Sequence, residues 1–320
     1  MPGVRPRLDV ATVAVFLRRH LGAPVEKVRE LRGGEICAAF AYALAGEQYV
    51  IRFGARESGF VHDRLAYERF TPAGIPIPPI HEIGRFGEQA FAISTYVPAG
   101  TVQHLLAARQ EALAPALVEM LDRVHQLDVR ATTGYGDVDD LGVGRSPSWI
   151  AYLGAIADED PDDFFGRWSR LYDESFLERP LCEQVLARLI ALLPCCPPIR
   201  SLVHGDFGFD NVIVEGERIT AVLDWANMKY GDFLFDVAWL NFWPSPVSYE
   251  DLFRRYYAER GRAVLRYEER LLCYTCYIGL VALRFFAHTG QRAPYNWARD
   301  RVRTLLQIGE AGSADPHVGQ

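Results

Sequence analysis

The sequence predicts an α+β protein of two lobes, a β-rich N-terminal lobe and a larger, mainly helical C-terminal lobe. The chain has 320 residues, which at ~100–200 residues per domain is long enough for two lobes. Between residues 36 and 97 there are four short apolar runs with turn residues between the members of each pair, as expected of strands. Beyond residue 98 most apolar residues recur at helical spacing. We therefore expect lobes at 1–97 and 98–310, and a disordered tail at 311–320.

The N-terminal lobe is expected to contain, in order, a helix at 8–21, strands at 36–44 and 48–53, a helix at 57–70, and strands at 80–85 and 90–97. Residues 8–21 carry apolar positions on one helical face. Tight turns at 45–47 and 86–88 each contain a glycine and join the two strand pairs. Residues 74–79 hold three prolines and cannot lie inside a helix.

The C-terminal lobe is expected to contain helices at 113–127 and 181–193, strands at 201–204, 212–215 and 219–224, and helices at 233–242, 248–260, 267–288 and 295–308. Ser248 is the predicted N-cap of its helix, and Gly261 lies just past the end. The acidic runs at 137–140 and 158–163 are interpreted as solvated loops and helix starts rather than ligand groups.

Composition and charge narrow the class of partner. Hydrophobic residues make up 49% of the chain and charged residues 23%, which are values of a globular protein. The net charge is −7, and because nucleic-acid binding needs a basic surface, this balance argues against such a partner. A mildly acidic protein suits small cationic ligands, although ordinary solubility also explains the charge.

Cysteine usage and the opening residues predict a cytoplasmic protein. The six cysteines show no disulfide-framework spacing, and Met1–Asp9 lacks the apolar core of a signal peptide. Cys273 and Cys276 have the spacing of a redox or zinc pair, but they lie in the apolar run Leu271–Phe286, which favours helix packing. Arg284 interrupts this run, which is shorter than the ~20 residues of a membrane span, so we expect no membrane partner.

The chemistry-bearing pattern is a set of three polar residues beside strands of branched apolar residues. Asn211 lies five residues after Asp206, and Asp224 lies thirteen residues after Asn211. Carboxylates between buried strands need partners, and Mg²⁺, which takes carboxylate oxygens together with substrate phosphates, is one that fits. A surface hairpin with Asp and Asn as turn formers is the alternative, but it leaves the two spaced carboxylates unexplained.

His-x-Asp-x-x-x-x-Asn followed by a second Asp follows the catalytic-loop logic of protein kinases. In the form His204-Gly205-Asp206 the sequence resembles the aminoglycoside phosphotransferase family of kinase-like enzymes, and within it the hygromycin B phosphotransferases of the 4-O-kinase type. The likeness covers roughly residues 8–290. The segments that carry it are Tyr49–Phe53, Gly59–Phe60 with Asp63–Arg64, Ala155–Asp158, Leu202–Asn211, Arg218–Trp225 and Phe242–Trp243.

The resemblance implies a bilobal protein-kinase-like fold and assigns roles to the matching residues. Asp206 would be the catalytic base, which accepts the proton of a substrate hydroxyl. Asn211 and Asp224 would hold Mg²⁺ at the nucleotide phosphates. His204 would be structural and position the loop by hydrogen bonds. Asp232 and Asp236 resemble the family's segment after the metal site, where they would support the backbone.

Several N-terminal residues are candidates for binding the nucleotide, which we expect to be ATP, with GTP as an alternative. Gly34 and Cys37 lie in a Gly-Gly turn before the first strand pair, where backbone N–H groups can approach phosphate oxygens. The fuller Gly-x-Gly-x-x-Gly pattern is absent there. Arg52 occupies the strand position where kinases usually carry Lys, and the hygromycin branch resembles this chain in having Arg.

Two acidic residues compete as the partner of Arg52, and the hinge offers the adenine contacts. Glu68 and Asp63 both lie on the following helix, and the sequence does not choose between them. At the hinge, the Thr95 carbonyl and the Val97 N–H are the candidate adenine contacts, because Pro98 has no N–H. A plain interdomain linker is the alternative interpretation of this stretch.

The acceptor implied by the resemblance is a cationic aminocyclitol, so its site needs acidic groups near the base. Asp206 itself and Asp210 are candidates, although the hygromycin-like pattern has Asn at the position of Asp210. Trp243 could form an apolar wall under sugar rings, or it could belong to the core. The sequence does not give the oligomeric state, and a monomer is the simplest expectation.

The leading hypothesis is an ATP-dependent O-phosphotransferase that inactivates an aminoglycoside or aminocyclitol antibiotic, with hygromycin B as the best candidate. A kinase of another small hydroxylated metabolite, such as choline, homoserine or a sugar, is the second hypothesis, because function resides in the acceptor site rather than the fold. A nucleotide-binding pseudokinase is the third. It predicts a missing base or metal residue, and only the Lys-to-Arg change departs from the kinase pattern.

Overall fold

The computed structural model describes residues 5–31, 33–34, 36–98, 100–161 and 164–311, with side chains up to residue 304. The chain forms two compact units, which are described separately. The first unit consists of Met1–Thr132, Asp137–Val143 and His204–Lys229, and the second of Thr133–Gly136, Gly144–Val203 and Tyr230–Gln320. The tail expected at 311–320 lies outside the described residues, apart from the end of the last helix.

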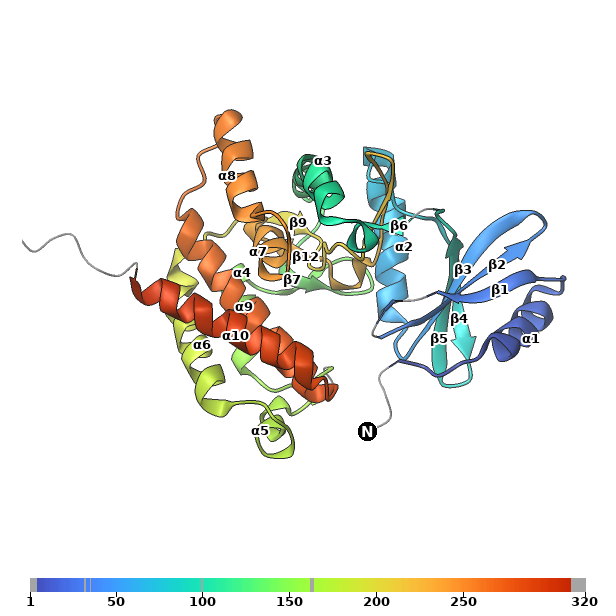
Figure 1. Cartoon of the computed structure of the whole chain (residues 1–320), viewed down its shortest axis with the longest axis horizontal. Coiled ribbons are helices and arrows are strands. Elements are labelled where there is room, and N and C mark those ends of the chain that lie inside the picture. Colours follow the sequence, from blue (N-terminus) through green and yellow to red (C-terminus); the bar gives the residue numbers. More distant parts are fainter. Residues whose placement is uncertain (1–4, 32, 35, 99, 162–163, 312–320) are drawn as a thin grey trace, which may run out of the picture. The chain divides into compact units, whose positions relative to one another are not determined.

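A five-stranded antiparallel sheet forms the first part of unit one (Figure 1). Its strands, in spatial order, are β1 (Glu26–Leu31), β2 (Ala38–Leu44), β3 (Glu47–Gly54), β5 (Gln89–Thr95) and β4 (Ile80–Phe86). The helix α1 (Val10–Leu21) packs on this sheet, with Val13 and Leu17 in one core with Phe40, Phe53 and Phe91. Asp9 caps α1 by accepting a hydrogen bond from the Thr12 N–H.

The rest of unit one brings distant segments of the chain together. The helix α2 (Ser58–Phe70) follows β3, and α3 (Ala107–His125) follows the short strand β6 (Gly100–Thr101). A second sheet has the order β11-β10-β6, where β10 is Val212–Glu215 and β11 is Arg218–Val222. The helix α3 contacts β11. These pairings join residues 98–132 to 204–229. Contacts between α2 and the turn at Trp225–Asn227, and a hydrogen bond from the Val222 N–H to the Pro76 carbonyl, join both segments to the N-terminal part of the chain, whereas the sequence suggested a boundary at 97/98.

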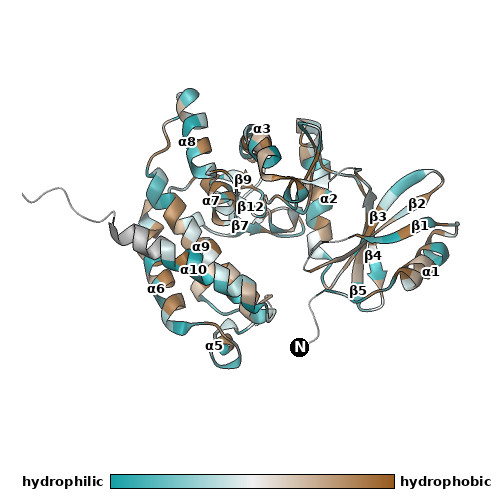
Figure 2. Ribbon diagram, viewed as in Figure 1, coloured by the Kyte–Doolittle hydropathy of each residue, from teal (hydrophilic) through white to brown (hydrophobic). Residues whose placement is uncertain are grey.

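The second unit is built around α9 (Tyr267–His288), which packs against α6 (Arg179–Leu192), α7 (Leu234–Phe242) and α10 (Arg292–Ala311) (Figure 1). Its other helices are α4 (Trp149–Gly154), α5 (Leu171–Glu174) and α8 (Tyr249–Glu259). A four-stranded sheet has the order β8 (Gly144–Ser146), β7 (Tyr135–Val138), β12 (Lys229–Gly231) and β9 (Ser201–Val203). Hydrophilic and hydrophobic bands alternate along α10, as expected of a helix with one buried side (Figure 2).

Short 3₁₀ turns complete the described secondary structure; they lie at Thr71–Ala73, Val102–His104, Ala155–Ala157, Trp168–Arg170, Leu193–Cys195 and Trp225–Asn227. The helix α9 is long and apolar enough to cross a membrane by length and composition alone, but 72% of its apolar stretch is buried within the protein. This burial is typical of a core helix. Cys273 and Cys276 are buried in α9, in agreement with the helix-packing interpretation.

The expected helices and hairpins are present, but the short elements α4, α5, β6, β7, β8 and β12 were not predicted, and two further differences concern β1 and β9. β1 was not predicted, because its Glu-Lys-Val-Arg-Glu-Leu sequence is largely exposed and shows no apolar alternation. The strand expected at 201–204 does not pair with the hairpin that follows it. β9 instead joins β12 in a different sheet, a long-range pairing that local sequence pattern does not report.

Candidate active site

A loop between β9 and β10 carries the predicted base, and His204 fixes its conformation. The His204 ring is buried, its Nδ1 lies 3.2 Å from the Asp206 N–H and its Nε2 lies 3.1 Å from the Leu223 carbonyl. Since a backbone N–H can only donate and a carbonyl can only accept, the ring is the neutral tautomer with its proton on Nε2. The hydrogen bonds expected of a structural His204 are therefore present.

Asn211 links the other two polar residues of the pattern. Its side-chain Nδ2 donates to the Asp206 carbonyl at 2.9 Å, and its own carbonyl accepts from the Leu223 N–H, one residue before Asp224, at 2.8 Å. The loop and the end of β11 are thereby held side by side. The structure brings together Asp206, Asn211 and Asp224, all within the first unit.

Burial and neighbouring negative charges disfavour the charged forms of the two carboxylates of this group, Asp206 and Asp224. Burial, followed by the negative charges of Asp224 and Asp210, raises the pKa of Asp206 well above its ordinary value. Burial and the negative charge of Asp63 likewise raise the pKa of Asp224 to about 6. Asp224 also has a left-handed backbone, with φ +58° and ψ +72°, a conformation that costs non-glycine residues energy and is frequent at functional sites.

The donor set fits a hard divalent cation. Carboxylate and amide oxygens are the ligands that Mg²⁺ takes, together with phosphate oxygens of a nucleotide. A cation would also offset the repulsion that disfavours the charged forms of Asp206 and Asp224. Among the described residues, no three His, Cys, Asp or Glu side chains gather as a self-sufficient metal centre. A cation at Asn211 and Asp224 would accordingly need oxygens from a ligand.

Arg52 pairs with Asp63 rather than with Glu68. Arg52 lies on β3 opposite Ala39 and Ala92, and its Nη2 donates to Asp63 Oδ2 at 2.5 Å. The Asp63 side chain is only 5% exposed, whereas Glu68 lies on the exposed side of α2. Of the two partners that the sequence left open, the structure therefore shows Asp63.

Asp63 and its neighbour also tie α2 to the segment that follows Asp224. The second oxygen of Asp63 accepts a hydrogen bond from the Trp225 N–H at 2.8 Å. His62 Nδ1 lies 3.1 Å from the Ala226 carbonyl. The second role of Asp63 was not predicted, because contacts between residues this far apart in sequence leave no local pattern.

The candidate phosphate-loop residues lie between β1 and β2, where Arg32 and Glu35 are outside the described residues. Gly34 has φ +75°, and a Cβ there would lie 3.1 Å from the Cys37 carbonyl, so the position suits glycine. Burial raises the pKa of the Cys37 thiol to about 11. The thiol is therefore neutral at ordinary pH and adds no negative charge that would repel a phosphate.

The hinge at the end of β5 uses its first N–H groups internally. The Thr95 N–H donates to the Pro79 carbonyl and the Tyr96 N–H to the Gln48 carbonyl, each at 3.1 Å. Val97 carries the next N–H, and Pro98 has none. This arrangement is compatible with the expected adenine contact at Val97, which stays a prediction, as does that of the Thr95 carbonyl.

Of the three acceptor candidates, Asp206 and Asp210 belong to the first unit and Trp243 to the second. Asp210 is exposed in the loop before β10, and its Oδ1 would lie 2.6 Å from a Cβ added to Gly208. Trp243 follows α7 and stacks on Trp297, with 5.6 Å between ring centroids. Trp243 thus belongs to an aromatic cluster of the second unit, and its contact with an acceptor stays a prediction.

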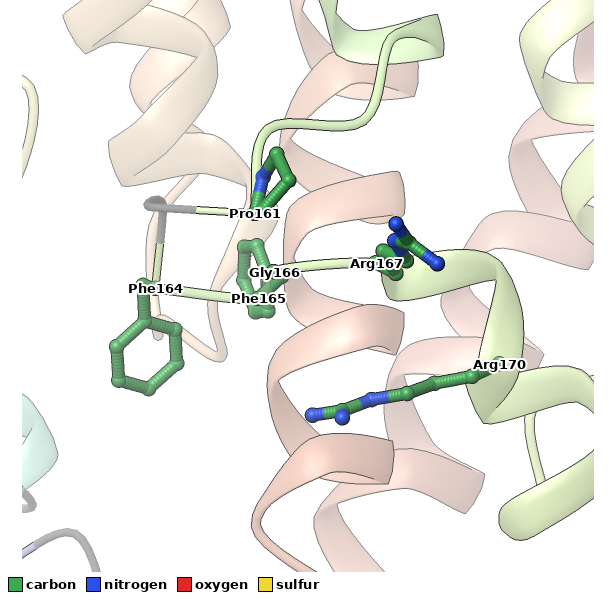
Figure 3. Close-up of a pocket in the computed structure, with 6 residues that line it drawn as sticks. All are labelled: Pro161, Phe164, Phe165, Gly166, Arg167 and Arg170. Atoms are coloured by element: carbon green, nitrogen blue, oxygen red, sulfur yellow. The ribbon is translucent and has the colours of Figure 1, made fainter.

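A pocket of about 540 Å³ lies in the second unit, lined by Pro161, Phe164, Phe165, Gly166, Arg167 and Arg170 (Figure 3). Phe164 stacks on Phe285, with 5.8 Å between ring centroids. The described part of the lining contributes two guanidinium groups, those of Arg167 and Arg170.

Comparisons with known proteins identify the family of the chain. The model of the phosphotransferase enzyme family matches residues 28–270. The chain is 31% identical over 306 residues to hygromycin-B 4-O-kinase of Escherichia coli. The aligned residues make up 95% of this chain and 87% of that protein.

Solved structures give the same result for the fold. A thermostable mutant of the aminoglycoside phosphotransferase APH(4)-Ia, in a ternary complex with ADP and hygromycin B, matches with a TM-score of 0.81 and 30% identity over 93% of this chain and 98% of that chain. A spectinomycin phosphotransferase, with a TM-score of 0.63, 12% identity and coverage of 94% and 100%, shares the fold alone. The chain has the kinase-like α+β fold and belongs to the phosphotransferase enzyme family.

Proposed function

We propose that the protein transfers the γ-phosphate of ATP to a hydroxyl of an aminoglycoside or aminocyclitol antibiotic, with hygromycin B and its 4-hydroxyl as the leading acceptor. The observation that carries the proposal is the convergence of Asp206, Asn211 and Asp224 through the hydrogen bonds of His204 and Asn211. Such a transfer would inactivate the antibiotic and give the host resistance to it.

Each residue of the site has a chemical task in this proposal. Asp206 orients the acceptor hydroxyl and takes its proton, and an elevated pKa makes its carboxylate a stronger base. Arg52, held by Asp63, binds phosphate oxygens of the nucleotide. Asn211 and Asp224 would hold Mg²⁺, which when bound neutralises negative charge on the β- and γ-phosphates.

The nucleotide is proposed to lie against the first unit's sheet. Gly34 and Cys37 would contact the phosphates, and the Thr95 carbonyl and the Val97 N–H would contact the adenine. An adenine nucleotide is favoured over GTP because the related APH(4)-Ia structures hold ADP or AMP-PNP. The described cysteines are all unpaired, which fits the reducing cytoplasm that we propose as the protein's compartment.

The acceptor assignment is supported by likeness and by charge. The relative that is 31% identical is a hygromycin-B 4-O-kinase, and the related ternary complexes contain hygromycin B. The carboxylates of Asp206 and Asp210 would attract the ammonium groups of an aminocyclitol. Trp243 would offer an apolar face to a sugar ring. Asp210, where the hygromycin-like pattern has Asn, is the position at which acceptor preference could differ.

The direct test is to incubate the protein with ATP, Mg²⁺ and hygromycin B and to analyse the antibiotic by mass spectrometry. One added phosphoryl group, located on the 4-hydroxyl by NMR, is the expected result. Parallel reactions with other aminoglycosides, choline, homoserine and a simple sugar separate the antibiotic kinase from a metabolic kinase. ATP binding measured by calorimetry, with no transfer to any acceptor, would instead support a pseudokinase.

A further inference from the structure

A buried lysine lies beside the proposed base. The chain has only two lysines, Lys27 and Lys229, among its 34 basic residues of the Lys and Arg types. Lys229 is 4% exposed, and its Nζ donates to the Asn227 carbonyl at 2.6 Å. On the neighbouring strand β7, Asp137 provides the counter-charge, with Oδ1 at 3.1 Å from Nζ. A cation buried in this way needs such partners.

The ammonium group is packed against the residue that precedes Asp206. Gly205 has φ +80°, and a Cβ there would lie 2.7 Å from Lys229 Nζ and 2.2 Å from the Asn227 carbonyl oxygen. The side chain of Asn227 turns the other way, and its Nδ2 lies 3.4 Å from Asp206 Oδ2. A continuous chain of contacts therefore runs from Asp137 through Lys229 and Asn227 to the carboxylate of Asp206.

The loop that follows Asp137 is itself held in place. Asp139 Oδ1 accepts from the N–H groups of Leu141 and Val143, both at 2.9 Å. Arg69 on α2 donates to the Leu141 carbonyl at 2.7 Å. The counter-ion of Lys229 thus adjoins a fixed loop, although Asp137 itself is 55% exposed.

We propose that Lys229 is a positioning residue of the phosphotransfer reaction, which holds Asp206 in its reactive orientation through Asn227, with Asp137 as its counter-ion. The proposal rests on the proposed function, because it takes Asp206 as the base. Lys229 touches no reacting atom in this arrangement. Lysine provides a compact ammonium group at this position, in a chain whose other basic residues of the Lys and Arg types are, apart from Lys27, all arginine.

The principal test compares the same substitution at the two lysines. Lys229→Met removes the ammonium group and keeps the length of the side chain, and Lys27→Met is the matched control on the exposed strand β1. For Lys229→Met we expect kcat for hygromycin B phosphorylation to fall ~10–100-fold, the cost of a misplaced catalytic group. The KM for ATP should change less than about twofold, because the nucleotide-binding groups are untouched. Lys27→Met should match the wild type.

Two milder variants test the contacts through which Lys229 is proposed to act on Asp206. They also provide a test if Lys229→Met does not fold. Asn227→Ala removes the last link to Asp206 and should lower kcat ~2–10-fold, as expected for one hydrogen bond. Asp137→Asn should lower kcat in the same direction, whereas Asp128→Asn, in the exposed pair with Arg130, should not. If Lys229 acts on Asp206 through Asn227, the double variant Lys229→Met/Asn227→Ala should lower kcat by less than the product of the two separate fold-decreases.

Hydrogen exchange of the ligand-free protein tests the inference without relying on catalysis. In Lys229→Met, or in Asp137→Asn if the first variant is unfolded, we expect faster exchange at the amides of 205–211 and unchanged exchange in β1–β3. Unchanged protection at 205–211 together with wild-type kcat would overturn the proposal. A loss of melting temperature with kcat intact would also overturn it, because Lys229 would then only stabilise the fold. A wild-type protein that phosphorylates no acceptor would reject the proposed function, while the exchange result would still decide whether Lys229 holds the loop.

Discussion

The backbone N–H of Trp225 donates a hydrogen bond of 2.8 Å to the carboxylate of Asp63, although the two residues are 162 positions apart in the sequence. The other oxygen of the same carboxylate accepts from Arg52 at 2.5 Å. One buried side chain on α2 therefore fixes both the proposed phosphate-binding arginine and the residue that follows Asp224. The helix α2 thus contributes to the site by fixing the positions of two segments that are distant in sequence, β3 and the turn after Asp224.

Replacing Asp63 by Ala should destabilise the protein and weaken nucleotide binding. The change leaves Arg52 without its carboxylate in a largely buried position, which typically costs ~3–5 kcal/mol. Urea unfolding measures the loss of stability, and calorimetry with ATP and Mg²⁺ measures the loss of affinity. Glu68→Ala on the same helix is the control, because exposed substitutions usually change stability by less than ~0.5 kcal/mol. Equal effects of the two variants would contradict the pairing of Arg52 with Asp63.

Most helices and hairpins could be predicted from local sequence pattern, because their apolar spacing and turn residues lie within short segments of the chain. The long helix α9 begins and ends at the predicted residues, and Ser248 caps α8 as expected, by accepting from the Asp251 N–H. β1 was missed because a charged, exposed edge strand shows no apolar alternation. The pairing of β9 with β12 was missed because it is formed between segments distant in sequence.

The same distinction applies to the site. The pattern of Asp206, Asn211 and Asp224 was visible as spacing within one stretch of chain, and it singled out the residues that the structure brings together. The roles of Lys229 and Asp137 were not visible, because their ion pair joins strands far apart in sequence and the run at 137–140 looked like a solvated loop. The rarity of lysine in an arginine-rich chain was the one sequence signal that pointed to Lys229.

Replacing Asp206 by Ala should abolish most turnover while leaving nucleotide binding largely intact. A general base contributes ~10²–10⁴-fold to rate, and the hydrogen bond from Asn211 goes to the backbone carbonyl of Asp206, which the substitution keeps. Single-turnover assays measure the rate, and calorimetry with ATP and Mg²⁺ measures binding. Asp128→Ala, at an exposed site in the same unit, should behave as the wild type. Wild-type turnover in Asp206→Ala would remove this residue as the base.

Replacing Asp224 by Asn should change how stability depends on pH in the absence of ligand. The pKa of Asp224 is about 6 in the folded protein against an ordinary value of 3.8. Between these values the folded state binds a proton that the unfolded state has lost, so the wild-type protein loses stability as pH rises from about 4 to about 6. Above pH 6 the loss is complete and amounts to at most ~3 kcal/mol. The side-chain amide that Asp224→Asn introduces cannot titrate, so this pH-dependent loss should be absent from the variant.

Thermal unfolding at pH 4.5 and pH 7.5 measures this effect. The same measurement with ATP and Mg²⁺ tests whether ligand binding reverses it. Without ligand, Asp224→Asn should melt at a higher temperature than the wild type at pH 7.5, and the two should differ less at pH 4.5. With ATP and Mg²⁺, the wild type should gain stability by binding, whereas Asp224→Asn should gain little. A variant that is less stable than the wild type at pH 7.5 without ligand would show that Asp224 is satisfied by the protein alone.

Replacing Gly205 by Ala should lower both the stability of the fold and the rate of catalysis. The same substitution at Gly216 separates the effect of backbone strain from that of a steric conflict. Gly205 and Gly216 both have positive φ, +80° and +60°, so alanine is strained at either position. At Gly216 a Cβ meets no atom within 4 Å, whereas at Gly205 it would lie 2.2 Å from the Asn227 carbonyl. Gly216→Ala should cost ~1–2 kcal/mol of stability from backbone strain and retain turnover.

For Gly205→Ala the steric conflict adds to that strain, because either Asn227 or the loop bearing Asp206 must shift. Urea unfolding should show a larger loss than for Gly216→Ala, and the surviving folded protein should turn over ~10–100-fold more slowly, since a displacement of about 1 Å at a reacting group costs on this scale. Equal stability losses in the two variants would mean that the Asn227 carbonyl can move at little cost. In that case the close packing beneath Asp206 would not be what orients the base.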